Sequence, residues 1–268
     1  MAALTEDHIE QLLIQEFVAL GYQYLNGLDI SPEGSVPERG YHEVVLRARL
    51  QNAIARLNPT FPAEAQEEAL RKVLRSDSPN LYQNNYQFHK YLTEGVDVEY
   101  RRLPSQEGKG QGTVRRAVRY TEVWLLDYQN PEQNEFLVVN QFTVIEGNVN
   151  KRSDVILFVN GLPLVVIELK NAADENATIQ AAFQQLQTYK QTIPSLFQYN
   201  EPLIASDGWD ALYGSLTASR QFFVPWKSID GRVIADEDMP QMKVMAKGML
   251  NQQVLPDLIR HFVVFQQN

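Results

Sequence analysis

The stretch from 154 to 171, DVILFVNGLPLVVIELKN, does most to decide the fold and the chemistry open to this sequence. Two apolar runs flank an Asn-Gly pair at 160–161, which is typical of a β-hairpin turn. Asp154 begins the first run, and Glu168 stands near the end of the second, two residues before Lys170. Because burial of charged groups is costly, acids at the edges of a hydrophobic hairpin indicate a function as well as a fold.

The composition indicates an ordinary globular protein. The chain has 268 residues, of which 44% are hydrophobic and 21% charged, enough for one large domain with a real core. The chain has no cysteine, which excludes disulfides, thiolate metal sites and a cysteine nucleophile, and fits a reducing cytosol. It shows no signal peptide and no apolar run of the roughly 20 residues that a membrane span needs. We therefore expect a cytoplasmic protein with no membrane partner.

Hydrophobic periodicity predicts the order of elements along the chain. Helical spacing indicates helices at 5–20, about 41–57, 62–75, 80–93, 176–193, 239–250 and 254–264. Alternating or continuous apolar runs indicate strands at 96–102, 119–128, 135–146, 154–160, 163–170 and 202–208. This order predicts an α/β (α+β) fold, with a mixed, largely antiparallel central sheet flanked by helices and an additional helical segment.

The acids and the lysine of the hairpin suit metal-assisted phosphodiester hydrolysis. Alternate residues of a strand share a face, so Glu168 and Lys170 point the same way while Leu169 points to the opposite layer. Two adjacent carboxylates repel, and a divalent cation such as Mg²⁺ removes the repulsion and supplies a Lewis acid. An ammonium beside the metal could orient or deprotonate the attacking water, or stabilise charge on a phosphoryl group. The alternative is a sheet edge whose charged ends simply face water.

The register of the hairpin decides whether the two acids can meet. A regular two-residue turn would place Asp154 across from Ile167, so that Glu168 points through the opposite side of the sheet. A three-residue loop, or a bulge between 155 and 167, would place Asp154 across from Glu168 instead. We predict one of these two arrangements, because only they allow one metal ion to be shared.

A basic strip lies between 101 and 120 although the whole chain carries a net charge of −9. Such a strip can follow the phosphates of a nucleic acid, and the alternative is a solvated hairpin with a flexible tip. Six cations oppose a single acid here, and they are Arg101, Arg102, Lys109, Arg115, Arg116 and Arg119.

Other familiar chemistries lack their motifs. No G-x-x-x-x-G-K-[ST] sequence is present, so we expect the chain not to bind ATP. No G-x-S-x-G sequence is present either. The four histidines, His8, His42, His89 and His261, have no metal-ligand spacing.

Several motifs in the same order resemble a known family. NQFTVIEG, SDVILFVNGLPLVVIELKNA, QLQTY, FQYNEPLIASDGWDALYGSLTA and WK resemble the restriction (R, motor) subunit of type I restriction–modification enzymes, within the PD-(D/E)xK nuclease superfamily. The similarity covers most of the chain. One departure is that Ser153 stands where the motif has its proline.

The resemblance implies a PD-(D/E)xK nuclease-like core and roles for individual residues. Asp154 and Glu168 would be metal ligands, with the Leu169 carbonyl as a third, and Lys170 would be the catalytic lysine. The remaining positions are Gln185 and Tyr189, which match the family's Q-x-x-x-Y motif, and Glu10, which matches an acidic position on its first helix. The implied metal is Mg²⁺, for which Mn²⁺ could substitute.

The resemblance also implies a domain arrangement and partners. Residues 1–235 would form the endonuclease domain, with a helical segment at about 38–95 packed on it or inserted in it. Residues 236–268 would connect to an ATP-driven motor outside this sequence. The implied function is that of a type I site-specific deoxyribonuclease, which acts on double-stranded DNA and assembles with modification and specificity subunits. The alternatives are a non-cleaving docking domain with a vestigial site and a free-standing resolvase or exonuclease.

Overall fold

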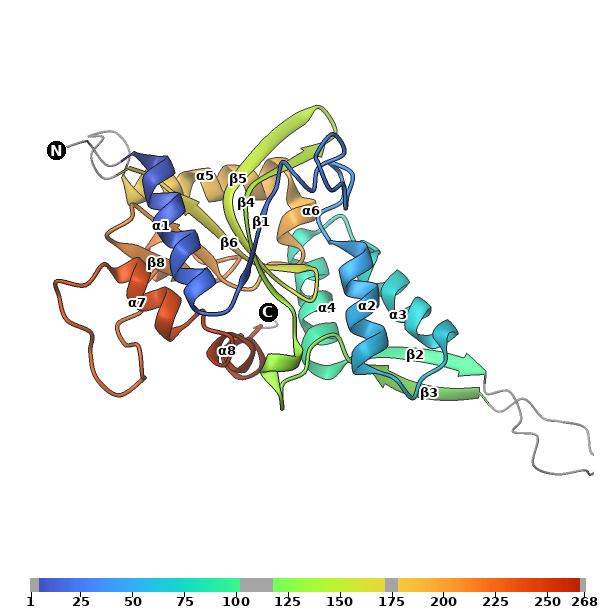
Figure 1. Cartoon of the computed structure of the whole chain (residues 1–268). Coiled ribbons are helices and arrows are strands. Elements are labelled where there is room, and N and C mark those ends of the chain that lie inside the picture. The colour runs from blue at the N-terminus through green and yellow to red at the C-terminus, as the bar shows by residue number, and fades with distance from the viewer. Residues whose placement is uncertain (1–4, 102–117, 172–177, 266–268) are drawn as a thin grey trace, which may run out of the picture.

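A mixed six-stranded sheet forms the centre of the protein in the computed structural model, which describes residues 5–101, 118–171 and 178–265 (Figure 1). Within the sheet β1 runs parallel to β4 and β6 runs parallel to β7, whereas the other neighbours are antiparallel. The strands, in their order across the sheet, are β1 (Gln23–Asn26), β4 (Phe136–Glu146), β5 (Val149–Val159), β6 (Leu162–Leu169), β7 (Leu203–Ser206) and β8 (Ala211–Gly214).

Helices flank this sheet, and three of them form a group beside it. Figure 1 shows that group next to a separate two-stranded sheet of β2 (Val96–Arg101) and β3 (Val118–Val123). The group consists of α2 (Arg47–Leu57), α3 (Ala63–Leu74) and α4 (Leu81–Glu94). The other helices are α1 (Glu6–Ala19), α5 (Ile179–Thr192), α6 (Pro194–Phe197), α7 (Gln241–Gly248) and α8 (Val254–Phe262). The predicted fold class and the additional helical segment are confirmed.

One continuous hydrophobic core joins the sheet to the helical segment. Strand β6 is buried along its whole length, which explains why its sequence is a nearly unbroken apolar run. Helix α1 packs its Ile9, Leu13 and Phe17 side on this core. The Thr5 hydroxyl accepts a hydrogen bond from the His8 backbone amide, so Thr5 caps α1. Among the described helices none combines the length and the hydrophobicity required to cross a bilayer.

Some predicted boundaries were wrong, for reasons that lie in tertiary contacts. Helix α2 begins at Arg47 rather than near 41, because the preceding loop is fixed by Arg39, whose guanidinium donates to the Glu43 carbonyl of the loop and to the Thr143 carbonyl of β4. Strand β3 ends at Val123, because the next backbone amide donates to the Asn58 side chain. Strand β5 begins at Val149, five residues before the apolar run starts. Strands β1 and β8 and helix α6 were not predicted, because each has only four residues, too few to show a hydrophobic period.

The β5–β6 hairpin contains both a tight turn and a bulge. Val159 pairs with Leu162 across a two-residue turn, in which Asn160 and Gly161 have φ of 51° and 80°. A side chain on Gly161 would also meet the Leu46 carbonyl oxygen at 2.6 Å, so this position requires glycine. The register then shifts between Leu157 and Phe158, and from there Val155 pairs with Ile167. The bulge predicted between 155 and 167 is confirmed.

Candidate active site

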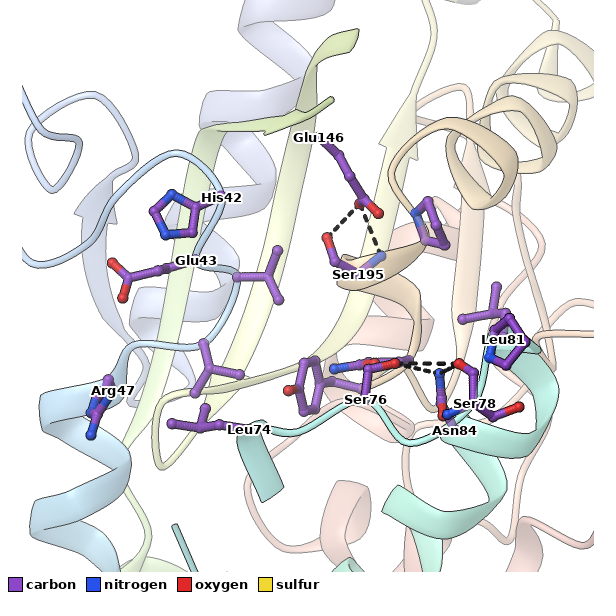
Figure 2. Close-up of a pocket in the computed structure, with 16 residues that line it drawn as sticks. His42, Glu43, Arg47, Leu74, Ser76, Ser78, Leu81, Asn84, Glu146 and Ser195 are labelled. Atoms are coloured by element: carbon purple, nitrogen blue, oxygen red, sulfur yellow. Dashed lines mark hydrogen bonds between the residues drawn. The ribbon is translucent and has the colours of Figure 1, made fainter. Parts of the chain in front are cut away.

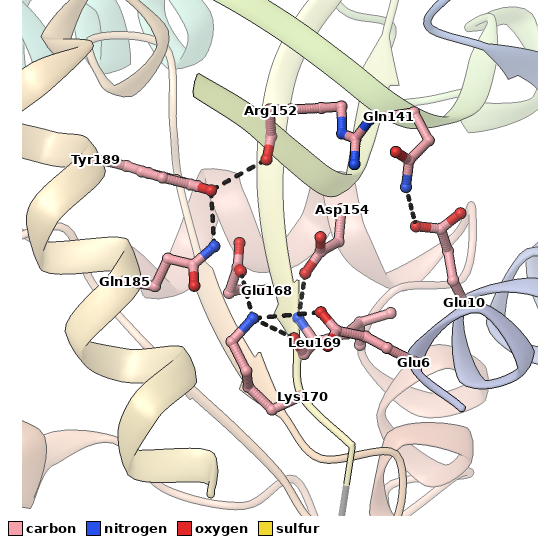
Figure 3. A network of polar contacts seen from close by, with 10 residues as sticks. All are labelled: Glu6, Glu10, Gln141, Arg152, Asp154, Glu168, Leu169, Lys170, Gln185 and Tyr189. Carbon is pink, nitrogen blue, oxygen red and sulfur yellow. Dashed lines mark hydrogen bonds and ion pairs between the residues drawn. The ribbon is translucent and has the colours of Figure 1, made fainter. Parts of the chain in front are cut away.

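The shifted register brings two carboxylates to the same place at the end of the hairpin. Continuing the pairing of Val155 with Ile167 by one residue sets Asp154 across from Glu168. Asp154 Oδ2 accepts a hydrogen bond of 2.8 Å from the Leu169 backbone amide, which fixes its side chain over β6. Figure 3 shows Asp154 and Glu168 facing the same space between α1 and α5. Without the bulge the two acids would lie on opposite faces of the sheet.

Glu168 is an incompletely paired acid in a fully buried position. Its side chain has 0% exposure, and its Oε2 atom is buried with no hydrogen-bond partner. Burial raises the pKa of Glu168 well above its usual value, and the charge of Asp154 raises it further. Burial likewise raises the pKa of Asp154, although the Leu169 amide opposes this. A hard divalent cation would satisfy the free oxygen and remove the repulsion, so these residues fit a Mg²⁺ ion.

Lys170 neutralises part of this negative charge. Its Nζ donates to Glu168 Oε1 at 2.9 Å and to the Leu169 carbonyl at 2.8 Å. Burial alone would lower the pKa of Lys170, but the neighbouring carboxylates together raise it. The side chain therefore remains an ammonium, which favours charge stabilisation over proton abstraction. The ammonium also contacts two groups that the resemblance assigns to the metal, so metal binding would require it to move aside.

Helix α1 contributes two further acids. Glu6 Oε1 lies 3.3 Å from Lys170 Nζ, a contact that the sequence analysis missed. Glu10 is buried, and its two oxygens accept hydrogen bonds of 2.7 Å from Asn140 and Gln141. Burial raises the pKa of Glu10, the two amides lower it, and the nearby charge of Asp154 raises it.

Few atoms are placed to ligate a metal ion in this conformation. Across residues 5–101, 118–171 and 178–265, no three His, Cys, Asp or Glu side chains are grouped closely enough to hold a metal ion. Glu10 therefore lies beside the Asp154–Glu168 pair without forming a ready-made third ligand, and its metal-binding role stays a prediction. The candidate donors are the two carboxylates and the Leu169 carbonyl.

Gln141 holds an unusual backbone conformation next to the acids. The β4–β5 pairing on either side places Gln141 across from Asp154, and its φ is 54°, in the left-handed region. This conformation directs the Gln141 amide to Glu10, as the hydrogen bond drawn in Figure 3 shows. Strained residues of this kind often lie at functional sites, because the surrounding structure must compensate for the strain. No sequence pattern marks this position.

The Q-x-x-x-Y pair of α5 borders the site from the other side. Gln185 donates a hydrogen bond of 2.7 Å to the Tyr189 hydroxyl, which in turn donates one of 3.0 Å to the Arg152 carbonyl. Burial raises the pKa of Tyr189, and the negative charge of Glu168 raises it further. The pair thus fixes the β5 backbone rather than contacting Lys170.

The predicted basic strip lies mainly outside the described residues, which include neither Arg102, Lys109, Arg115 nor Arg116. Arg101 and Arg119 belong to the outer end of the β2–β3 pair, where only the backbone is described. The role of the strip in DNA binding therefore stays a prediction.

A surface cavity of about 560 Å³ lies elsewhere, between the loop before α2, the α3–α4 connection and α6 (Figure 2). The acidic pair does not line it. Its Glu146 Oε2 accepts hydrogen bonds of 3.1 and 2.6 Å from the backbone amide and hydroxyl of Ser195, and no acid that lines the cavity has a buried oxygen without a partner. The cavity therefore lacks the unsatisfied acid that marks the hairpin site.

Comparison with known proteins finds one matching family and several relatives. Residues 3–222 match the family described as the type I restriction enzyme R protein N terminus. The HindI endonuclease subunit of Haemophilus influenzae is 37% identical over 99% of this chain and 24% of its own length. A putative endonuclease subunit of Methanocaldococcus jannaschii, MjaIXP, is 31% identical over 91% of this chain and 22% of its own length. The chain thus spans about a quarter of these relatives.

Proposed function

This chain belongs to the family of type I restriction enzyme R protein N termini, and from that premise we propose that it is the DNA-cleaving part of a longer endonuclease subunit. The relatives are named as type I restriction enzyme endonuclease subunits. The observation that carries the proposal is the bulged hairpin, which aligns Asp154 with Glu168 and leaves a buried carboxylate oxygen without a partner.

Mg²⁺ is the cation that we propose for the site, with Mn²⁺ as a substitute. Asp154, Glu168 and the Leu169 carbonyl would hold it, and Glu10 is the nearest further acid. When bound, the ion would act as a Lewis acid toward a phosphodiester and lower the pKa of a water molecule. Phosphodiester cleavage needs both effects, because the attacking oxygen and the developing charge must be stabilised together.

The chain's own side chains have separate tasks in this proposal. The Lys170 ammonium stabilises negative charge at the phosphate, in agreement with its raised pKa. Asp154 and Glu168 supply the negative charge that attracts the ion. Tyr189 and Gln185 keep the β5 backbone in position through the Arg152 carbonyl. This division assigns charge stabilisation to Lys170 and ion binding to the carboxylates.

The remainder of the enzyme would lie outside this sequence. We propose that it includes the ATP-driven motor, that modification and specificity subunits complete the complex, and that double-stranded DNA in the cytoplasm is the substrate. Residues 1–235 would be the endonuclease domain and 236–268 the connector toward the motor.

Substitution of the three central residues tests the proposal. Asp154→Ala and Glu168→Ala should lose both Mg²⁺ binding and DNA cleavage, whereas Lys170→Ala should keep the metal and lose cleavage, because an ammonium has no lone pair for a metal. Titration calorimetry with Mg²⁺ or Mn²⁺ measures the first property, and nicking of a plasmid the second. Glu146→Ala is the control, since this acid lies in the other cavity and should change neither property.

Equal metal affinity in all three variants would contradict the assignment. A folded, DNA-binding wild-type chain that binds no metal would favour the docking alternative instead. These outcomes are separable because metal binding, DNA binding and cleavage are measured independently.

A further inference from the structure

The β4–β5 hairpin forms an arm that extends past the rest of the sheet. Strand β1 accompanies β4 only as far as Asn140, and β6 accompanies β5 only from Val155 onward. Beyond these points β4 and β5 pair with each other alone, up to the turn at Gly147. Figure 1 shows this arm as a curved two-stranded ribbon rising from the sheet. The acidic pair therefore lies at the base of an arm that has one buried face and one exposed face.

One face of this arm leads directly to the acids. Alternate residues of a strand share a face, so Asn150 and Arg152 lie on the same face of β5 as Asp154. The first two are exposed and Asp154 is half-buried, while Ser153 on the other face is fully buried. Arg152 is about 7 Å along the strand from Asp154. Its cation is thus the next charged group outward from the site.

Arg152 is a cation without an evident structural task. No carboxylate among the residues that the structure describes forms an ion pair with it. Its backbone, in contrast, is firmly held, because its carbonyl accepts the Tyr189 hydroxyl at 3.0 Å. Figure 3 shows the Arg152 side chain extending from β5 toward Gln141. An exposed guanidinium on a firmly held backbone is available to a ligand at a defined position, which is the preorganisation that a binding residue needs.

The negative charge of the site opposes the binding of a polyanionic substrate, and a cation such as Arg152 would offset this repulsion. Four acids surround the site, Glu6, Glu10, Asp154 and Glu168, and Lys170 is the cation bonded among them. A nucleic-acid strand that approached along the arm would meet net negative charge unless cations outside the cluster contacted its phosphates.

We propose that the outer face of the β4–β5 arm is a DNA-backbone contact surface, in which Arg152 binds the phosphate next to the one presented to Asp154 and Glu168. This inference rests on the proposed nuclease function and adds to it a residue that positions the substrate strand. The guanidinium suits this role, because its planar set of donors can bind two phosphate oxygens at once.

Salt-dependent DNA binding tests the assignment. Binding of a fluorescent 30-base-pair duplex to the chain is measured by anisotropy at several salt concentrations, with Ca²⁺ present as the hard cation. Loss of one phosphate contact should flatten the slope of log K against log[salt] by about 0.9. Arg152→Gln should therefore weaken binding about tenfold at 50 mM salt and about threefold at 200 mM, whatever the duplex sequence. Arg152→Lys should keep the slope, because it keeps the charge.

Arg75→Gln is the matched control, since Arg75 is also an exposed arginine but lies on the α3–α4 connection. Its slope should equal that of the wild-type chain. An unchanged slope in Arg152→Gln, or equal changes in both variants, would overturn the assignment, as would a wild-type chain that does not bind the duplex. Failure of the nuclease proposal would look different: Arg152→Gln would still flatten the slope, but the wild-type chain would cleave no DNA with Mg²⁺ or Mn²⁺.

Discussion

Replacing Glu168 with glutamine tests the cost of the acidic pair while preserving its shape. In the wild-type chain Glu168 is fully buried, one oxygen accepts from Lys170, and the other has no partner. A glutamine carbonyl can still accept from Lys170, and its amide can donate to Asp154, so a repulsion becomes a hydrogen bond. The variant should therefore be more stable than the wild-type chain when metal is absent.

The expected gain follows from the type of interaction that is removed. Relief of a buried, incompletely paired charge contributes about 1–3 kcal/mol to the free energy of unfolding. In a chain of this size about 1 kcal/mol raises the melting temperature by about 2–4 °C. With a central value of about 2 kcal/mol, Glu168→Gln should melt about 4–8 °C higher than the wild-type chain in EDTA.

Magnesium should cancel or reverse this order. An ion at about 100 times its dissociation constant stabilises the wild-type chain by about 2.7 kcal/mol, and the variant lacks a ligand for it. Differential scanning calorimetry of both proteins in EDTA and in saturating Mg²⁺ measures the four values. A variant less stable than the wild-type chain in EDTA, or an equal Mg²⁺ response in both, would refute the reasoning.

Glu201→Gln is the control for burial alone. Glu201 is also buried, but its carboxylate has a partner, His89 Nδ1 at 3.1 Å. Its replacement should lower stability, because it weakens a buried pair. The Mg²⁺ response should stay at the wild-type level.

The stability difference should also depend on pH in a defined direction. Burial, with the charge of Asp154, raises the pKa of Glu168 above its ordinary 4.5, so the folded chain keeps this proton to higher pH than the unfolded chain does. The folded state then binds more protons, and stability falls as pH rises from about 4.5 through the raised pKa. The Glu168→Gln variant has no titrating group at this position, so its stability does not fall with pH for this reason. Its advantage should be small near pH 4.5 and grow toward neutral pH, as urea unfolding in EDTA can measure.

Three further predictions concern the framework of the site. Deleting Leu164, which has no partner in the β5–β6 pairing, should remove the bulge and give a regular hairpin in which Asp154 still lies across from Glu168, so Mg²⁺ binding should persist; loss of Mg²⁺ binding in a deletion variant with wild-type circular dichroism would contradict the alignment. Tyr189→Phe removes the hydrogen bond to the Arg152 carbonyl, so it should cost about 1 kcal/mol in urea unfolding and also slow cleavage. Tyr199→Phe, which removes a comparable bond to the Val73 carbonyl, should cost stability and leave the cleavage rate unchanged. Gln141→Val should destabilise the chain by about 1–3 kcal/mol and Gln141→Asn by less, since asparagine tolerates a positive φ; equal losses would argue against backbone strain.

The sequence predicts this fold where local pattern and tertiary environment agree. Strand β6 was found because every one of its residues is buried, which requires an unbroken apolar run. The first half of β5 was missed because its outward residues are polar and exposed on the arm. The start of α2 was missed because a single buried arginine, Arg39, fixes the preceding loop by bonding to the Glu43 carbonyl and to the distant Thr143 carbonyl of β4. Short-range patterns contain no information about such contacts.

The same distinction applies to the site. The spacing of Asp154, Glu168 and Lys170 along one hairpin made them candidates, and alternation of side chains limited the register to arrangements that align the acids. The choice between a longer loop and a bulge needed the structure, because it depends on how Asn160 packs: its amide donates to the Leu125 carbonyl and to Asn134. Glu6 was missed because α1 reaches the site only through tertiary packing, 164 residues away in sequence.

The bulge at Leu164 also constrains how this family can change in evolution. Since side chains alternate along a strand, inserting or deleting a single residue between Asp154 and Glu168 inverts one acid relative to the other, whereas a change of two residues preserves their alignment. Active relatives should therefore differ in this interval by even numbers of residues, or by an odd number together with the gain or loss of a bulge. The length of this hairpin thus determines whether the proposed catalytic centre can form, and odd-length changes without a compensating bulge would mark lineages in which cleavage has been lost.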